Sequence, residues 1–287
     1  MRKLAVFFAV ILLCCTVGKV WHVAKDGFSL NRISIWKNGI VSHLDPKTQL
    51  ALDQPFYYLG RGHQCYAFGS LDNRYVIKIP RTDRYRIPFW LQALPFRSHR
   101  ALIRKDLAHR ESFLLESFRI SFEELQNQTA LLAIHLGETP DDGTKLELVD
   151  RLGRKHKLSL HNTAFVLQRK TSILMDQFQQ ALAAHDRDGA SKMLDSFTEI
   201  VADRARKGIL NKDPSFLRNF GFDGNQAFQI DIGSFYRRDD VAGIFAYEKS
   251  IRETMHPVRQ WLAELDREML NRFDEKLSKV YLEGPRS

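Results

Sequence analysis

Apolar and polar residues alternate along three short runs near the start of the chain, which predicts three β-strands. The runs cover residues 56–59, 65–68 and 75–80. They are rich in aromatic and β-branched residues, and the second connection, 71–74, has the composition of a turn. Because both connections are short, we expect the three strands to form an antiparallel meander.

The spacing of apolar residues changes to three or four between residues 101 and 127, which predicts an amphipathic helix. Further strands are expected at residues 129–136, 145–150, 157–160 and 163–168, with a hairpin turn at 151–154. From Leu174 the pattern is helical to the end of the chain, with one interruption between Gly208 and Phe235. The sequence therefore predicts a β-rich half with one inserted helix, followed by an α-rich half.

The composition is that of a folded protein with a mixed surface. The chain has 287 residues, and a hydrophobic fraction of 44% can supply a sizeable core. No internal repeat or low-complexity linker occurs, which favours one compact unit with sub-lobes after about residue 45. The net charge is +9, from 43 Lys and Arg against 34 Asp and Glu, and the charges are interspersed. A positive field favours anionic partners in general, and without a basic tract nucleic acid is not an expected partner.

The N-terminal residues predict a membrane or export segment. Arg2 and Lys3 precede an uncharged apolar run over residues 4–17. At ~1.5 Å per residue the run spans about 21 Å, which is short of the ~30 Å hydrocarbon core and closer to a signal peptide. No small-x-small cleavage site follows, so residues 1–20 are expected to be either a signal peptide or an uncleaved anchor. Cys14 and Cys15 lie in this run, so no intrachain disulfide is available to Cys65 in the folded part.

The sidedness of such a segment is open. Arg2 and Lys3 on the cytoplasmic side would place the body of the protein across the membrane, whereas Lys19 and Lys25 favour the reverse. Localisation at a membrane or export from the cell is therefore expected, without a decision between the two.

A glycine pair and a lysine predict a nucleotide site in the β-rich half. Gly60 and Gly62 lie at the turn between the first two strands, where residues without Cβ let backbone N–H groups approach phosphate oxygens. No Gly-Lys-Ser or Gly-Lys-Thr follows, which excludes a Walker P-loop. Lys78 lies in the middle of the third strand, from which its ammonium group can reach phosphates. An edge-strand lysine that extends to water is the alternative interpretation.

Three polar side chains in the α-rich half predict phosphoryl transfer. Asp213 lies in a loop, Asn219 follows six residues later, and Asp231 ends a short apolar strand just before Gly233. Transfer of a phosphoryl group to a hydroxyl needs one carboxylate to orient the acceptor and oxygen ligands that hold Mg²⁺ against the phosphates. The three residues supply these groups in chain order.

Together these motifs resemble the protein-kinase-like superfamily, including its small-molecule and atypical bacterial branches, over residues 55–235. The resemblance implies that nucleotide binding uses Gly60 and Gly62 as the glycine loop, Lys78 as the lysine of the third strand, and Glu111 as its helical partner. It also implies that Asp213 is the catalytic-loop aspartate, Asn219 the metal-binding asparagine, and Asp231-Ile232-Gly233 the counterpart of Asp-Phe-Gly. Residues 165–169 would be the fifth strand, leading to a hinge that receives adenine.

Some positions depart from the pattern of that superfamily. Cys65 replaces a third glycine, and Asn211 and Lys212 replace His-Arg. Asn219 comes one residue later than usual, so its side chain reaches a metal only if the loop is bulged. Glu111 lies far along the chain from Lys78, and Glu116 is the alternative partner. No Ala-Pro-Glu motif follows, so a standard platform for protein substrates is not expected.

We therefore expect an α+β, two-lobed protein-kinase-like fold. A β-rich N-lobe would cover residues 50–170 and a helical C-lobe residues 171–287, after an extension over 21–49. ATP and Mg²⁺ would bind between the lobes, and the enzyme would phosphorylate a hydroxyl acceptor, a small molecule, lipid, sugar or protein that the sequence does not identify. Two alternatives remain: a membrane-associated or exported pseudokinase scaffold, and a basic membrane-surface binding protein without a nucleotide site.

Overall fold

A computed structural model describes residues 16–88, 91, 97–237 and 243–284. The chain forms two compact units, each drawn from two segments. The first unit consists of Met1–Leu107 and Ala133–Gln168, and the second unit consists of Ala108–Leu132 and Arg169–Ser287.

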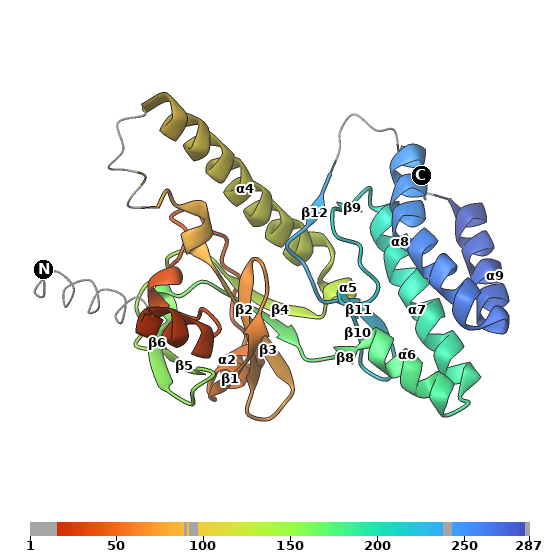
Figure 1. Ribbon diagram of the computed structural model, residues 1–287, viewed down its shortest axis with the longest axis horizontal. Helices are drawn as coiled ribbons and strands as arrows, with labels where there is room; N and C mark the ends of the chain where they lie inside the picture. The colour runs from red at the N-terminus through yellow and green to blue at the C-terminus, as the bar shows by residue number, and fades with distance from the viewer. Residues whose placement is uncertain (1–15, 89–90, 92–96, 238–242, 285–287) are drawn as a thin grey trace, which may run out of the picture. The chain divides into compact units, whose positions relative to one another are not determined.

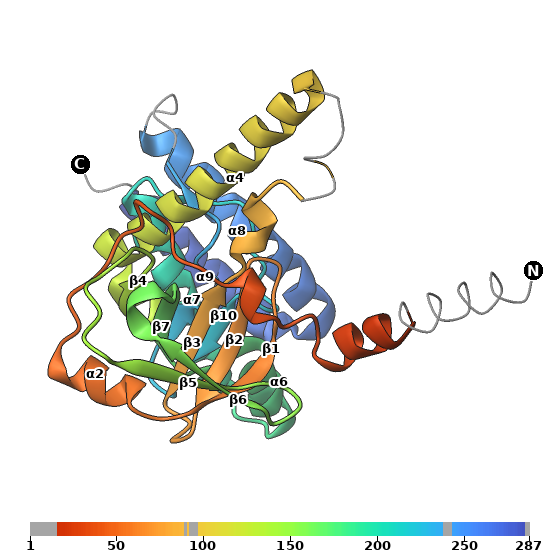
Figure 2. The ribbon, with the colours of Figure 1, turned by 90° about the vertical axis from the view of Figure 1, so that its left-hand side faces the viewer.

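A seven-stranded sheet forms the centre of the first unit, as far as the described residues show (Figure 1). Its strands are β1 Phe56–Arg61, β2 Cys65–Ser70, β3 Tyr75–Pro80, β4 Leu131–His135, β5 Lys145–Val149, β6 Lys155–Ser159 and β7 Phe165–Arg169. Their order in the sheet is β4-β7-β3-β2-β1-β5-β6. The antiparallel pairs β1–β2 and β2–β3 confirm the predicted meander, and Figure 2 shows these strands side by side.

Short helices and the N-terminal segment cover parts of this sheet. The helices are η1 Leu30–Arg32, α2 Pro46–Leu52, η2 Thr82–Tyr85 and η3 Leu160–Asn162. Helix α2 begins where Asp45 caps it, because the Asp45 carboxylate accepts a hydrogen bond of 2.7 Å from the backbone N–H of Thr48 and Pro46 occupies the first turn.

Part of the described segment before residue 50, around Phe28, belongs to the core of the first unit. Phe28 is 3% exposed, and its ring lies 5.2 Å from that of Tyr66 and 5.3 Å from that of Phe68. The hydroxyl of Tyr66 donates to the carbonyl of Gly27 over 2.6 Å. The predicted extension is therefore packed against the strands, and its apolar contacts stabilise the unit.

The second unit is mainly helical. Its elements are the part of α4 Arg97–Glu124 that follows Leu107, with α5 Gln126–Thr129, α6 Leu174–Ala183, α7 Arg187–Arg206, α8 Gly243–Leu265 and α9 Arg267–Glu283. Helix α7 packs against α6, α8 and α9 around a core that includes Phe178, Phe197 and Met269. Asp186 caps α7 and Asp266 caps α9 through their carboxylates.

Two small sheets interrupt the helices of the second unit. One has the strand order β11-β10-β8 and the other β12-β9. Their strands are β8 Ser172–Ile173, β9 Leu210–Asn211, β10 Phe220–Phe222, β11 Ala227–Gln229 and β12 Phe235–Tyr236. Most of them fall in the predicted interruption between Gly208 and Phe235.

The predicted fold class is confirmed. The helix expected over residues 101–127, the four later strands and the helical C-terminal part all occur. The protein is an α+β molecule with a β-rich and a helical unit, which is consistent with a two-lobed kinase-like fold.

The predicted membrane segment over residues 1–20 lies largely outside the described residues. Residues 16–24 are helical. Among the helices that the structure describes, none combines the length and apolar character needed for a membrane span.

Candidate active site

Gly60 lies at a bulge in β1, where the pairing with β2 shifts register after Tyr58. A Cβ atom added at Gly60 would meet nothing within 4 Å, and its φ is not positive. The packing and the backbone conformation of the unit therefore do not require glycine here. The open space above Gly60 is available to a ligand that approaches the backbone closely.

Gly62 closes the turn between β1 and β2. Its backbone N–H donates to the carbonyl of Cys65 over 2.8 Å, so this N–H, expected to face phosphate, is engaged within the turn. A Cβ atom at Gly62 would lie 3.5 Å from the same carbonyl, an ordinary contact. Of the two glycines, Gly60 has the environment that better fits a ligand-binding role.

Lys78 lies in line with Gly60 across the sheet. Gly60 pairs with Ala67 of β2, and Ala67 pairs with Lys78 of β3. Paired residues on neighbouring strands share a face of the sheet, so the half-buried Lys78 stands beside a methyl group and a glycine. On the opposite face Tyr66 and Ile77 are fully buried. The sheet thus presents a strip of small residues that ends at an ammonium group.

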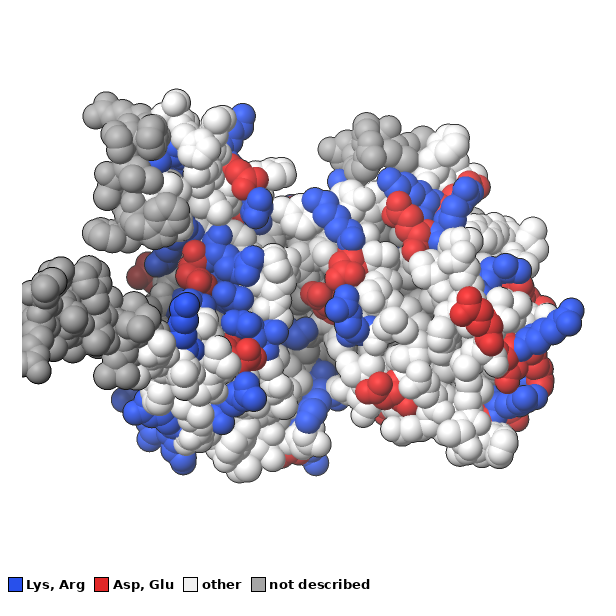
Figure 3. All heavy atoms as spheres, in the orientation of Figure 1, with Lys and Arg blue, Asp and Glu red and all other residues white. Residues whose placement is uncertain are grey.

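The positive charge of the protein is concentrated in the first unit. Lys and Arg outnumber Asp and Glu by two to one there, whereas acidic residues are in slight excess in the second unit. Figure 3 shows Lys and Arg spread over the visible face of the first unit, with few acidic side chains among them. Such a surface attracts phosphorylated ligands.

In the second unit Asn219 joins the loop of Asp213 to the segment that follows β11, just before Asp231. Its side-chain amide donates to the backbone carbonyl of Asp213 over 2.9 Å, and its backbone carbonyl accepts from the N–H of Ile230, also over 2.9 Å. Asn219 is 6% exposed. Buried Asn219 therefore links the backbone at Asp213 to the residue before Asp231, although Asn219 lies one residue later than the superfamily pattern.

Local hydrogen bonds hold the loop between Asn211 and Asn219. The N–H of Asn219 donates to the carbonyl of Ser215 over 3.1 Å, and the N–H of Asp213 donates to the side-chain oxygen of Asn211 over 2.9 Å. These bonds fix both ends of the loop. The metal-binding role of Asn219 stays a prediction.

The carboxylates of Asp213 and Asp231 form no ion pair with any residue that the structure describes. Asp213 is exposed, and Asp231 is half-buried with one oxygen 3.3 Å from the N–H of Gly233. Nearby Asp223, by contrast, lies 3.7 Å from Arg169. Acidic groups without an ion pair are available to a cation or to a proton donor.

Asp231 and Asn219 are the residues that would hold a magnesium ion brought by a nucleotide. The described residues contain no group of three or more His, Cys, Asp or Glu that could hold a metal by itself. Asp231 offers a carboxylate, and the amide oxygen of Asn219 accepts no hydrogen bond from the described residues. Mg²⁺ is usually held by one or two such side chains together with phosphates and water.

The two candidate partners of Lys78 differ in their surroundings. Glu116 forms an ion pair of 2.7 Å with Arg119 on the surface of α4. Glu111, half-buried on the same helix, forms no ion pair with the described residues. This difference favours Glu111 over Glu116, although its role is still a prediction.

Ser117 is a site residue that the sequence analysis missed. Its hydroxyl donates to the carbonyl of Ile232 over 2.6 Å and accepts from the N–H of Phe235 over 2.7 Å. Both bonds are buried and fasten the segment that follows Asp231 to α4. A serine among the apolar residues of a helix gives no indication of such a partner in the sequence.

Lys212, next to Asp213, was also not predicted to have a fixed position. Its ammonium nitrogen lies 3.6 Å from the ring centre of Phe113 and 5.5 Å from that of Tyr236. Cation–π contacts of this kind hold the charge near the loop.

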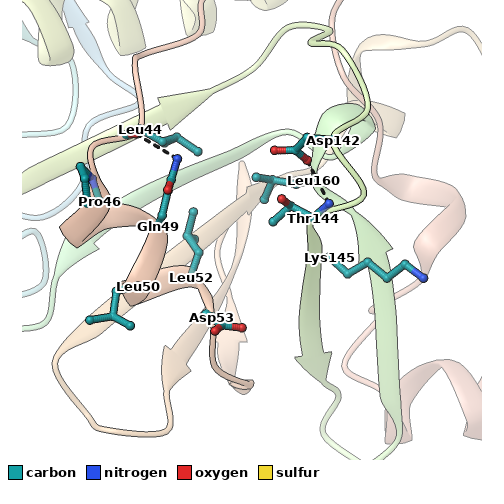
Figure 4. A pocket seen from close by; sticks show the side chains of 10 residues that line it. All are labelled: Leu44, Pro46, Gln49, Leu50, Leu52, Asp53, Asp142, Thr144, Lys145 and Leu160. Atoms are coloured by element: carbon teal, nitrogen blue, oxygen red, sulfur yellow. Dashed lines mark hydrogen bonds between the residues drawn. The ribbon is translucent and has the colours of Figure 1, made fainter.

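A hollow of about 520 Å³ elsewhere in the first unit contains none of the predicted site residues. Figure 4 shows it between α2 and the strands β5 and β6, with Gln49, Asp53, Asp142 and Lys145 among its side chains. The carboxylate of Asp142 accepts from the N–H of Thr144 and belongs to a turn. These residues do not resemble the expected phosphate site.

Comparisons with known proteins give a partial structural similarity. No protein-family model and no curated protein matches the chain. A crystal structure of WbdD at 2.2 Å is 18% identical with a TM-score of 0.37, and the match covers 75% of this chain and 44% of that one. A second WbdD structure, described as a bifunctional kinase-methyltransferase, is 17% identical with a TM-score of 0.36, covering 75% and 43%. This chain therefore spans less than half the length of each structure.

A co-crystal structure of WbdD with the kinase inhibitor LY294002 gives similar values, 17% identity and a TM-score of 0.37, with 77% and 45% of the two chains covered. Sequence identities and TM-scores this low assign no chemistry to the present chain.

Proposed function

We propose that the protein is an ATP- and magnesium-dependent phosphotransferase that acts on a hydroxyl acceptor. The observation that carries this proposal is the position of Asn219: its buried side chain bonds to the loop at Asp213, and its backbone carbonyl bonds to Ile230, next to Asp231. These contacts support the proposal that the carboxylates of Asp213 and Asp231 and the amide oxygen of Asn219 act at one site. Phosphoryl transfer needs these groups and little other protein chemistry.

Each residue has a distinct task in this proposal. Asp213 accepts a hydrogen bond from the acceptor hydroxyl, orients its oxygen and takes its proton as the oxygen attacks the γ-phosphorus. Asp231 and Asn219 supply oxygen ligands to the metal, which, when bound, stabilises charge on the phosphates. Lys78 contributes a positive charge to the phosphates, and Gly60 allows close approach of the nucleotide.

MgATP binding tests the proposal through the thermal stability of the full-length protein. A ligand that binds only the native state, at a hundredfold excess over its Kd, stabilises it by ~2.7 kcal/mol. We expect Lys78→Ala to reduce the shift in Tm, and Asp231→Ala to remove its dependence on Mg²⁺.

The matched controls are Lys155→Ala, on the exposed end of β6, and Asp188→Ala, whose side chain is 95% exposed; both should behave like the wild type. Slow release of ADP would identify an enzyme, and a shift without turnover would identify a pseudokinase. A folded protein that calorimetry shows not to bind ATP, with or without Mg²⁺, would refute the proposal.

We further propose that residues 1–20 direct the protein to a membrane or an export pathway. The apolar run over residues 4–17 after Arg2 and Lys3 supports this proposal. Without these residues the remaining chain is expected to be soluble and to unfold cooperatively, because the packed segment begins near Asp26. Protease protection in the native cell would then establish the side of the membrane on which the body lies. Full-length protein recovered in the cytosol without detergent, with the shortened chain aggregating, would contradict the assignment.

A further inference from the structure

An apolar pocket of about 320 Å³ opens beside Asp213 in the second unit. Its walls come from the loop that follows Asp213 and from α8, and its apolar side chains include Phe216, Leu217, Val258 and Trp261. This volume is near the lower limit of ordinary ligand pockets, so it suits a small molecule or one end of a larger one.

Aromatic packing fixes the shape of the pocket. The ring of Trp261 lies 6.0 Å from that of Phe216 and 5.5 Å from that of Phe178. Val258 is 1% exposed, whereas Leu217 is 55% exposed and stands where a ligand can cover it. The pocket is therefore formed by a rigid aromatic wall and an uncovered leucine.

No Lys, Arg or His is among the described residues that line the pocket, and the Ser215 hydroxyl, which also lines it, can both donate and accept. Asp213 and Glu253 are the charged residues that line it, and both are acidic. Pro257, inside α8, has no N–H, so the carbonyl of Glu253 four residues earlier lacks its helical donor. A ligand with a negative charge would be repelled, whereas a hydroxyl group finds several acceptors.

We infer that this pocket binds the phosphoryl acceptor, and that the acceptor is an alcohol with a compact apolar body and no negative charge. The inference rests on the proposed function, because it takes Asp213 as the residue that receives the acceptor hydroxyl. The apolar body covers Leu217 and packs against Trp261, and the hydroxyl group donates to the Asp213 carboxylate. The oxygen then forms its bond to the γ-phosphorus, the bond from that phosphorus to ADP breaks, and the hydroxyl proton passes to Asp213.

Binding of 2-phenylethanol to the full-length protein, measured by ligand-observed NMR titration without nucleotide, tests the pocket. Phenylacetate is the matched anionic probe, because it has the same ring with a carboxylate in place of the CH₂OH group. We expect 2-phenylethanol to bind and phenylacetate to bind at least about tenfold more weakly, since two acidic side chains face it.

Two leucine variants locate the binding site. Leu217→Lys replaces an exposed apolar wall residue and should weaken 2-phenylethanol binding about fivefold, while the new positive charge improves phenylacetate binding. Leu265→Lys is the matched control, because Leu265 is 48% exposed near the end of the same unit's α8 and does not line the pocket. Equal effects of the two variants, or equal binding of the two probes, would overturn the inference.

Turnover separates this inference from the proposed function. With MgATP, 2-phenylethanol should accelerate ADP formation in the wild type and in Leu265→Lys, and less so in Leu217→Lys. Absence of MgATP binding would refute the phosphotransferase itself, whatever the probes do. If MgATP binds and is turned over with another alcohol, but 2-phenylethanol neither binds nor reacts, the pocket is not the acceptor site.

Discussion

Replacement of Ser117 by alanine tests whether α4 holds the segment after Asp231 in place. The Ser117 side chain is fully buried, as are its two partners, the carbonyl of Ile232 and the N–H of Phe235. Alanine fills almost the same space, so the change removes hydrogen bonds without creating a large cavity.

The expected loss of stability follows from the hydrogen bond that each partner of Ser117 loses. The N–H of Phe235 would be left buried without its acceptor, which costs about 1–3 kcal/mol, and the lost bond to Ile232 adds about 1 kcal/mol. Ser121 also reaches the carbonyl of Ile232, at 3.3 Å, and can replace part of the second loss. We therefore expect Ser117→Ala to lower the free energy of unfolding by about 2–4 kcal/mol.

Urea unfolding followed by circular dichroism measures this change. Ser278→Ala is the matched control: its hydroxyl bonds to the carbonyl of Asp274 over 2.8 Å on the exposed side of α9, and its loss should cost less than about 0.5 kcal/mol. The same substitution should also affect metal binding, because Asp231 is adjacent to Ile232, whose carbonyl Ser117 holds. In Ser117→Ala the Mg²⁺ concentration that gives half of the ATP-dependent Tm shift should rise, whereas Ser278→Ala should leave it unchanged.

Two results would refute this reasoning. If Ser117→Ala unfolds with nearly the wild-type free energy, the buried N–H of Phe235 has found another acceptor and Ser117 does not fasten the segment. If the variant loses stability but keeps the wild-type dependence on Mg²⁺, the segment after Asp231 does not position a metal ligand.

Three other predictions concern Asp213, Phe28 and the buried arginine Arg204 of α7. Asp213→Asn should keep the Tm of the wild type within a few degrees and lower the rate of ADP formation by at least about a hundredfold, because the amide cannot take the acceptor proton; near-normal turnover would disprove the catalytic assignment. Phe28→Ala should cost about 3–5 kcal/mol in urea unfolding because it empties a buried aromatic site, whereas exposed Tyr57→Ala should cost far less. Burial lowers the pKa of Arg204 to about 10, so the unfolded state binds more protons between pH 10 and 12.5 and this residue's contribution to stability improves as pH rises through that window. Above about pH 10, the free energy of unfolding of the wild type should therefore rise relative to that of Arg204→Met. If the difference between the two free energies stays constant with pH, burial of the Arg204 charge is not the cause.

Local sequence patterns predicted most of the fold but not the contacts that hold the site. The alternation over residues 56–80 and the spacing over 101–127 identified the meander and α4, because each pattern reports which side of an element is buried. The residue types around Asp213 and Asp231 identified candidate chemistry. Their connection through Asn219 could not be predicted, since it depends on hydrogen bonds to Asp213 and Ile230 that the residue types alone do not specify.

Contacts between residues that are far apart in the sequence could not be predicted, for a physical reason. Ser117 and Ile232 are 115 positions apart, and Phe28 packs on residues that follow it by about forty. No periodicity within either segment specifies such a partner. The apolar pocket beside Asp213 likewise needs both the loop at Phe216 and the helix at Trp261, which come from separate regions of the sequence.

The alternation of the chain between its two units has a consequence for synthesis on the ribosome. Residues 108–132 belong to the second unit but emerge well before residues 169–287, on which they pack. Until the last third of the chain has been made, the apolar side of α4, including Leu114 and Phe118, has no completed core to cover it. No single cut in the chain separates the two units. If the two units were expressed separately, residues 108–132 would have to be taken out of the N-terminal part and joined to residues 169–287. A nascent chain arrested just after residue 169 is expected to depend on chaperones, even though the seven described strands of its large sheet have already been synthesised.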